Sequence, residues 1–465
     1  MTNRVYIKNL SDHQGEEVTL SGWVDSVRNQ GKMVFFDFRD SSGLVQCIVL
    51  SKSEALEDAR RLNNEFVINI HGRVNPRPDK DKKPDILNGE IELEVLNIVI
   101  LNECDVLPFH LLETINVDEN LRLKYRYLDF RSQRMKKNLI NRYKTQKFIR
   151  DYLDKEGFLE IETPLISAPT PEGSRSFVVP SRAFKGNFYS LPQSPQQYKQ
   201  LLMVGGIDKY FQFARCMRDE DARGDRQPEF TQLDMEMAFV SEEDVISFNE
   251  SLLIDLIKKN YPEKRIQQIP FPRMSYKEVM EKYGSDKPDI RDNKNDLNLL
   301  AFLWVVDFPM FEKTDDENLD NTGKWTYTHN PFSMPKEEFF DDFMSGKEIE
   351  KILTTQYDIT LNGFEIGGGS LRNYEAKALK KTFSIMSYED KRIEDNFGHI
   401  IKAFNFGAPP HGGIAWGFDR LLMILENEPN IREVIPFTKT GDGKDLLMNA
   451  PTDISEKQKK ELGLK

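Results

Sequence analysis

The chain has few cysteines and no long apolar run. Only Cys47, Cys104 and Cys216 occur among its 465 residues. Three scattered thiols are too few for a disulfide framework or a structural zinc site. No apolar stretch is long enough to span a bilayer, and the N-terminus lacks the apolar core of a secretory signal. These absences predict a cytoplasmic protein with no membrane association.

Two common nucleotide-binding fingerprints are absent as well. The sequence has neither the G-x-G-x-x-G pattern of dinucleotide-binding folds nor the lysine-containing loop of P-loop enzymes. It does have three consecutive glycines, residues 367–369, between Glu365 and Arg372. Such a run is costly to order in a strand, so a ligand or a neighbouring backbone must come close. These absences argue against the dinucleotide-binding and P-loop folds.

The charge balance is acidic. The chain carries 64 Lys and Arg against 76 Asp and Glu, a net charge of −12. An acidic sum speaks against a nucleic-acid partner, because binding to phosphates needs cations. Basic residues nevertheless gather locally at 73–83 and 122–137, and a nucleic acid contacts only local surfaces. The sequence is therefore compatible with salt-sensitive binding to a nucleic acid through basic patches.

The N-terminal region, residues 1–105, contains five strand-like runs. They lie at residues 18–24, 33–39, 45–49, 67–74 and 91–101, with an expected helix at 54–64 between the third and the fourth. Five strands with a helix after the third fit an OB-fold β-barrel, which often binds single-stranded nucleic acid. A barrel that serves only for packing is the alternative.

The remainder is expected to be a linker, residues 106–120, and a catalytic domain, residues 121–465. The linker has no strong periodicity, and the domain is predicted to rest on a mainly antiparallel sheet, which makes the whole chain α+β. A helix is expected at 138–153, followed by a strand that ends at Pro164. The apolar positions that suggest the helix are Leu139, Ile140, Tyr143, Phe148, Ile149, Tyr152 and Leu153. Residues 311–324 suggest an exposed acidic loop.

A dense cluster of charges separates two alternating segments, residues 210–214 and 231–237. Alternation of this kind is typical of paired strands, so the sequence predicts a hairpin that carries an ionic site. A charged surface hairpin is the alternative. Further along, residues 409–417 are rich in glycine and lead into an apolar helix with Arg420 just inside it. A guanidinium at that place can pack on an adenine ring or bind a phosphate.

Together these segments resemble the motifs of the class II aminoacyl-tRNA synthetases. Their amino-acid sequences are most similar to those of the bacterial aspartyl-tRNA synthetases. Residues 155–166, which follow the expected helix, resemble motif 1, which implies a homodimer. The hairpin resembles motif 2, and residues 409–425 resemble motif 3. The resemblance covers almost the whole chain, except that the domain usually inserted between motifs 2 and 3 is essentially missing around residues 292–298.

The resemblance implies a ligase that activates L-aspartate with ATP and transfers it to the 3′ end of tRNA-Asp, with tRNA-Asn left open as a second acceptor. Arg218 and Arg420 match the catalytic arginines, and Asp358 and Glu365 match the Mg²⁺ positions. The matched ATP contacts are Arg218, Asp219, Glu220, Gln227, Glu365, Gly417, Phe418, Asp419 and Arg420. The matched aspartate contacts are Glu172, Gln193, Gln196, Lys199, Arg218, Asp234, His329 and Arg372.

Three residues of the expected barrel, Arg28, Phe35 and Gln46, match positions that meet the anticodon bases in the family. One residue departs from the family pattern. Asn330 replaces the second of two successive histidines in a mobile loop, so the pH dependence is expected to differ because a titrating group is absent.

Three alternatives stay open from the sequence. An asparaginyl-tRNA synthetase is disfavoured by Lys199, which would pair with a substrate carboxylate. A free-standing asparagine synthetase of the same catalytic fold would lack the N-terminal barrel. A non-catalytic tRNA-binding paralogue should have lost the ATP-binding residues, yet Arg218, Glu365 and Arg420 are all present.

Overall fold

The structure of the chain is a computed structural model that describes residues 4–169, 175–314 and 325–464. It divides into two compact units, Met1–His110 and Leu111–Lys465, each of which is considered by itself. Within the described residues, no helix is both long enough and apolar enough to cross a membrane.

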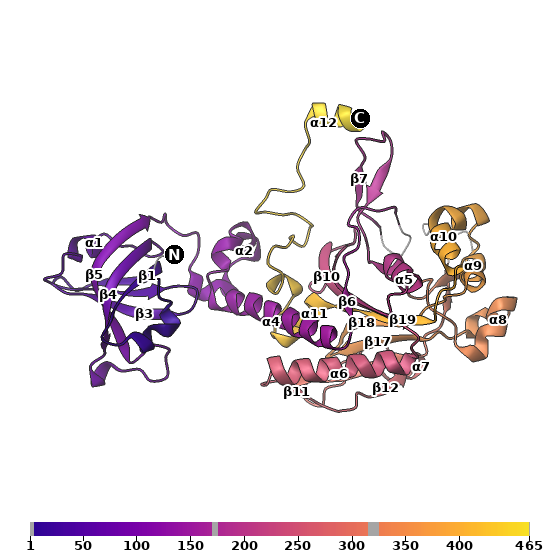
Figure 1. Ribbon diagram of the computed structural model, residues 1–465, viewed down its shortest axis with the longest axis horizontal. Coiled ribbons are helices and arrows are strands. Elements are labelled where there is room, and N and C mark those ends of the chain that lie inside the picture. The colour runs from indigo at the N-terminus through magenta and orange to yellow at the C-terminus, as the bar shows by residue number, and fades with distance from the viewer. Residues whose placement is uncertain (1–3, 170–174, 315–324, 465) are drawn as a thin grey trace. The chain divides into compact units, whose positions relative to one another are not determined.

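The first unit is a closed five-stranded barrel with strand order β1-β2-β3-β5-β4 (Figure 1). Its strands are β1 (Glu17–Asn29), β2 (Val34–Arg39), β3 (Leu44–Val49), β4 (Val67–Pro76) and β5 (Ile91–Asn102), with α1 (Leu56–Arg60) after β3. Alternation along β2 turns Val34, Phe36 and Phe38 into the barrel core and leaves Phe35 and Asp37 partly exposed outside. The predicted OB-fold is confirmed.

The second unit is built on an eight-stranded sheet of order β12-β14-β17-β18-β19-β10-β9-β6. Its strands are β12 (Arg273–Ser275), β14 (Phe302–Val306), β17 (Gln356–Leu361), β18 (Phe364–Leu371), β19 (His411–Gly417), β10 (Glu229–Ala238), β9 (Lys209–Met217) and β6 (Leu159–Glu160). The first and last neighbours pair in parallel, and all the others are antiparallel. The predicted mainly antiparallel sheet is confirmed, and so is the hairpin, which is β9 and β10.

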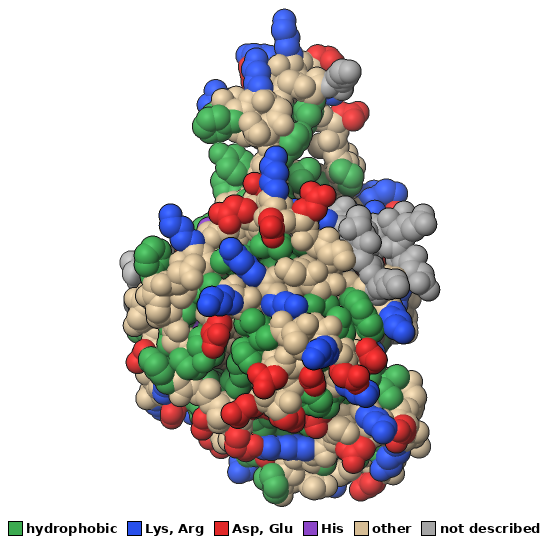
Figure 2. Space-filling view, turned by 90° about the vertical axis from the view of Figure 1, so that its right-hand side faces the viewer, with side chains coloured by type: hydrophobic (Ala, Val, Ile, Leu, Met, Phe, Trp, Pro, Cys, Tyr) green, Lys and Arg blue, Asp and Glu red, His purple; other side chains and the backbone are tan. Residues whose placement is uncertain are grey.

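Helices cover both faces of this sheet (Figure 1). The α-helices after the barrel are α2 (Glu119–Lys124), α3 (Arg126–Asp129), α4 (Gln133–Lys155), α5 (Gln196–Val204), α6 (Glu242–Asn260), α7 (Tyr276–Tyr283), α8 (Phe340–Ser345), α9 (Ala376–Ile385), α10 (Asp390–Phe404), α11 (Phe418–Leu425) and α12 (Glu456–Leu462). Helices α4 and α6 run side by side under one face, and α5 lies on the other. Acidic and basic side chains are interspersed on the surface over α8 to α10 (Figure 2), so the net negative charge does not gather on that face.

Helix α4 is confirmed, but only part of its buried face is the apolar one that the sequence suggested, namely Ile149 and Leu153. Ile140 and Tyr143 are exposed, whereas Asn138, Arg142 and Thr145 are buried together with apolar residues. The polar side chains on this face form hydrogen bonds with residues that are distant in the sequence. The side chain of Asn138 donates to Glu428 Oε1 at 2.7 Å, for example.

Close packing of the central strands explains the glycine run. A Cβ on Gly369 of β18 would lie 2.1 Å from the carbonyl oxygen of Gly413 on β19. A Cβ on Gly413 would in turn lie 2.1 Å from the carbonyl oxygen of Met235 on β10. The sequence predicted that a ligand or a neighbouring backbone comes close to the glycines. At Gly369 and Gly413 it is the backbone of the adjacent strand.

Two connecting segments differ from expectation. The linker region contains a 3-10 helix, Leu111–Asn116, and α2, which Asp118 caps by accepting from the backbone N–H of Leu121 at 3.1 Å. Capping and tertiary packing, rather than periodicity, set these short elements. The expected acidic loop begins with a strand, β15 (Phe311–Lys313), that pairs with β16 (Trp325–Tyr327) and buries Phe311, and residues 315–324 lie outside the described part.

Candidate active site

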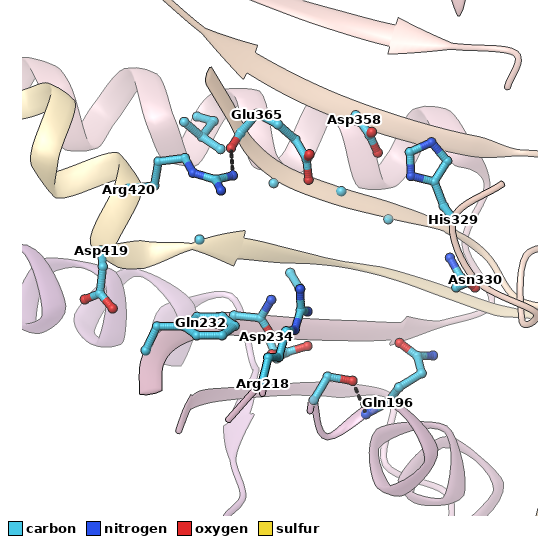
Figure 3. A pocket seen from close by; sticks show the side chains of 18 of the residues that line it. Gln196, Arg218, Gln232, Asp234, His329, Asn330, Asp358, Glu365, Asp419 and Arg420 are labelled. Atoms are coloured by element: carbon cyan, nitrogen blue, oxygen red, sulfur yellow. Dashed lines mark hydrogen bonds between the residues drawn. The ribbon is translucent and has the colours of Figure 1, made fainter. Parts of the chain in front are cut away.

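A cavity of about 400 Å³ opens in the second unit between the β9–β10 hairpin and the strands β17 to β19. Figure 3 shows Arg420, Glu365, Asp358 and His329 on one wall, with Arg218, Asp234 and Gln196 facing them across the cavity. Most of the matched substrate residues border it. These are Gln196, Lys199, Arg218, Glu220, Gln227, Asp234, His329, Asp358, Glu365, Arg372, Gly417, Asp419 and Arg420.

The floor at one end of the cavity is a buried group of charges. Lys199 Nζ on α5 donates to Asp234 Oδ1 on β10 at 2.9 Å and lies 3.3 Å from Glu236 Oε2. Arg372 donates to both oxygens of Glu236, at 2.8 and 3.1 Å. Within the described residues, Asp234 Oδ2 and Gln196 Nε2 are buried without a hydrogen-bond partner. Both residues border the cavity, so these two atoms are available to a polar ligand bound there.

Two matched aspartate contacts are not among the residues that line this cavity. Gln193 is buried, and its side-chain amide donates to Ser176 Oγ at 2.8 Å. Glu172 lies outside the described residues. Their predicted roles stay predictions.

Arg218 stands where the hairpin leaves β9. Its backbone N–H donates to the Pro228 carbonyl at 2.9 Å, which holds the start of the hairpin loop. Its guanidinium carbon lies 5.2 Å from the centre of the Phe230 ring. In the described part of the chain no acidic side chain pairs with this guanidinium. A cation in that situation can bind an anionic group of a ligand.

The hairpin loop contributes further polar groups. Glu220 pairs with Arg226 at 3.4 Å. Gln227 accepts from the backbone N–H of Lys439 at 3.0 Å through its side-chain oxygen. Its amide nitrogen is buried and has no partner in the described residues, although it borders the cavity. Asp219 is not one of the lining residues.

The first three residues of helix α11 all match ATP contacts, but their side chains have different surroundings. Phe418 is fully buried, with its ring 5.1 Å from that of Phe213 in an edge-to-face contact. Asp419 accepts from the backbone N–H of Thr231 at 2.7 Å and from Arg142 on α4. Arg420 donates to the Glu365 carbonyl and pairs with Asp225 at 3.1 Å. Of the three side chains, only that of Arg420 is aimed at the cavity by its contacts.

Asp358 on β17 and Glu365 on β18 form a carboxylate pair. A Cβ on Gly368 would lie 2.6 Å from Asp358 Oδ1 and 3.8 Å from Glu365 Oε1, so both carboxylates converge over that glycine. Burial and the nearby Glu365 charge raise the pKa of Asp358 well above its usual range. Two converging carboxylates of this kind fit a hard divalent cation, which would relieve their repulsion.

His329 completes the same wall. Its ring packs edge to face on Phe308 with the centroids 4.8 Å apart, and burial lowers its pKa despite the acidic Glu365 and Asp286 nearby. The Asn330 side chain accepts from the backbone N–H of Phe332 at 3.0 Å. It therefore fixes the turn after His329.

The sequence did not single out Glu236 or Gln356, which both belong to this site. Glu236 holds Lys199 and Arg372, and the Gln356 amide donates to Asp358 Oδ1 at 3.2 Å. A signal was available, because each lies two positions from a matched acid on the same strand and thus on the same face.

The three matched anticodon residues share the outer face of the barrel. Arg28 on β1 is opposite Phe35 on β2, and Gln46 on β3 is opposite Asp37 on β2. Arg28 is exposed and pairs with Asp37 at 3.5 Å, while Phe35 and Gln46 are partly exposed. A cation, an aromatic ring and an amide thus lie on adjacent strands, an arrangement suited to unstacked bases.

Comparison with known proteins places this geometry in a family. Residues 118–441 match the pattern of the class II tRNA synthetases of the D, K and N group, and residues 18–101 match the OB-fold nucleic-acid-binding domain. The chain belongs to the class II tRNA synthetases. The resemblance seen in the sequence is confirmed.

Full-length relatives agree with this assignment. An aspartate–tRNA(Asp/Asn) ligase of Dehalococcoides mccartyi is 36% identical over 590 aligned positions, which cover 98% of this chain and 97% of the relative. An aspartate–tRNA ligase of Staphylococcus aureus is 36% identical over 580 positions and covers 97% of each chain. Because these alignments are much longer than the 465 residues of this chain, the relatives contain many residues that have no counterpart in it.

Solved structures show the same fold. The asparaginyl-tRNA synthetase of Pyrococcus horikoshii with asparaginyl-adenylate superposes with a TM-score of 0.75 at 21% identity and covers 95% of this chain and 99% of that one. The aspartyl-tRNA synthetase of Entamoeba histolytica gives a TM-score of 0.71 at 22% identity, covering 93% of this chain and 91% of that one. At these identities the likeness concerns the fold alone.

Proposed function

We propose that this enzyme is an aspartate–tRNA ligase, which forms aspartyl-adenylate from L-aspartate and ATP and passes the aspartyl group to tRNA. The observation that supports this best is the buried pair of cations, Lys199 and Arg372, on the floor of the cavity that also holds Arg218 and Arg420. Such a cavity suits an amino acid with a side-chain carboxylate beside a nucleotide. The printed names of the bacterial relatives point the same way.

In the first step an oxygen of the aspartate α-carboxylate attacks the α-phosphorus of ATP, the bond to the β-phosphate oxygen breaks, and pyrophosphate leaves. Negative charge grows on the α-phosphate oxygens, so fixed cations accelerate the step more than a nucleophilic side chain could. Arg218, at the mouth of the hairpin, would supply such a cation at the α-phosphate. Arg420, at the start of α11, would bind the γ-phosphate.

In the second step a ribose hydroxyl of the tRNA 3′ end attacks the aspartyl carbonyl, and AMP leaves. Asp358 and Glu365 would hold Mg²⁺, which neutralises phosphate charge when it is bound. His329, whose pKa burial lowers, would meet the amino-acid end as a neutral ring. Asp234 would bind the α-ammonium group through its unpartnered oxygen.

The barrel would bind the anticodon through Arg28, Phe35 and Gln46. We infer tRNA-Asp as the acceptor, because the relatives carry the aspartate name. Their (Asp/Asn) designation makes tRNA-Asn a second candidate. An enzyme of translation would work in the cytoplasm.

A homodimer is part of the proposal. Strand β6 is an edge of the eight-stranded sheet, and Leu159 within it is 53% exposed. Leu165 and Ile166 just beyond it, and Tyr143 on α4, are also exposed. Exposed apolar side chains and an unpaired sheet edge are typical of a protein–protein interface.

Pyrophosphate exchange tests the first step. ATP should exchange label with pyrophosphate when aspartate is present and far less when asparagine replaces it, because an amide would bring N–H groups against two buried cations. Efficient exchange with asparagine would instead favour an asparaginyl-tRNA synthetase. Charging purified tRNA-Asp and tRNA-Asn with aspartate side by side then identifies the acceptor.

A further inference from the structure

Glu236 lies beneath the amino-acid end of the cavity and is fully buried. It does not border the cavity itself. Both cations that we assign to the substrate carboxylate bind to it. Arg372 donates through Nε to Oε1 at 2.8 Å and through Nη2 to Oε2 at 3.1 Å, and Lys199 Nζ lies 3.3 Å from Oε2.

The residues packed around the Glu236 carboxylate leave it no room to move. A Cβ on Gly413 would lie 2.2 Å from Glu236 Oε2, so only glycine fits there. Burial would raise the pKa of Glu236, but Arg372 and Lys199 outweigh it and hold that pKa at about 2. The side chain is therefore an anion at every working pH.

The charges of the floor balance before any substrate enters. Lys199 and Arg372 contribute two positive charges, and Asp234 and Glu236 contribute two negative charges. An isolated buried cation is costly, so the two cations need these anions to stay charged in place. Because the two cations are already neutralised, they do not reject asparagine through unbalanced charge. Discrimination then depends mainly on the direction of the N–H groups of Lys199 and Arg372 that are left free.

We propose that Glu236 is a positioning residue for aspartate, which fixes the Lys199 ammonium and the Arg372 guanidinium so that their free donors converge on the side-chain carboxylate of the substrate. This inference rests on the proposed function. Arg372 keeps two more fixed contacts, because its Nη1 donates to Ser370 Oγ at 2.9 Å and its Nη2 to the Gly413 carbonyl at 3.3 Å. Its one remaining N–H group is on Nη1. Glu236 is the one acceptor that the two cations share among the described residues.

Two conservative variants separate position from charge. Glu236→Gln keeps the shape but turns an N–H group toward a cation, and Glu236→Asp keeps the charge but withdraws it by one methylene. Both should raise the KM for aspartate about ten-fold or more, since a charged hydrogen bond to the substrate is weakened, and both should leave the KM for ATP within about two-fold. The ratio of aspartate to asparagine activation should fall in both.

Pyrophosphate exchange with separate titrations of aspartate, asparagine and ATP gives these values, and thermal unfolding reports on folding. A parallel rise of both KM values, a change confined to Glu236→Gln, or failure of both variants to fold would overturn the positioning role. Failure of the parent enzyme to activate aspartate would instead overturn the proposed function.

Discussion

Replacing Lys199 by methionine removes one cation from the floor of the cavity while keeping most of the side-chain volume. Lys199 is 1% exposed and pairs with Asp234 and Glu236. If it also binds the substrate carboxylate, aspartate loses a charge-assisted hydrogen bond of about 1.5 to 3 kcal/mol, which corresponds to a roughly 10- to 150-fold rise in KM. The KM for ATP should change little, because the nucleotide cations are other residues.

The same substitution should lower stability, since the buried Asp234 then loses its ion-pair partner and Glu236 keeps only Arg372. Breaking a buried ion pair costs about 3 to 5 kcal/mol, so thermal unfolding should occur at a clearly lower temperature. Lys258→Met, on the exposed side of α6, is the matched control and should change neither quantity. An equal rise of KM for aspartate and ATP would mean that the whole site collapsed and would refute a carboxylate-specific role.

Four other predictions probe other parts of the molecule. Arg218→Ala should slow pyrophosphate exchange by about 100- to 1000-fold with unfolding unchanged, and normal exchange would exclude a transition-state role. Glu365→Gln should raise the Mg²⁺ concentration needed for half-maximal exchange, and an unchanged Mg²⁺ titration would remove this carboxylate from the metal site. Phe35→Ala should lower aminoacylation at limiting tRNA and leave pyrophosphate exchange unchanged, whereas the control Val99→Ala, exposed on β5, should change neither. Normal charging by Phe35→Ala would mean that this face of the barrel has only a structural role. Burial and Asp307 raise the pKa of Glu242 to about 7 from 4.5, so the folded state keeps a proton that the unfolded state releases and the group's stabilisation is lost as pH rises through 7. Glu242→Gln should therefore gain about 1 kcal/mol of stability over the parent between pH 5 and pH 8, after allowance for solvent screening, and a pH-independent difference would contradict that shift.

The barrel could be predicted almost strand by strand, because apolar residues recur at every second position along its strands. Val34, Phe36 and Phe38 show why this works, since local sequence alone decides which side of β2 is buried. The hairpin of β9 and β10 was predictable for the same reason.

Helix α4 could be predicted as a helix, but its orientation could not. Its buried face includes Asn138 and Arg142, which a periodicity argument assigns to solvent. Their partners, Glu428 and Asp419, lie more than 270 residues further along the chain. Only the folded chain brings these groups together, so the buried polar contacts had no local signal.

The family resemblance located the site but did not separate side chains that meet the substrate from those that hold the walls. Asp419 and Arg420 are neighbours in one motif, yet successive residues on a helix point about 100° apart. Asp419 therefore turns back to accept from Thr231 on β10 and Arg142 on α4, while Arg420 extends along the cavity wall to Glu365. One carboxylate thus ties the three motif segments together at the base of α11. Both of its oxygens already accept hydrogen bonds, so we infer that Asp419, which borders the cavity, supports ATP binding by fixing the direction of Arg420.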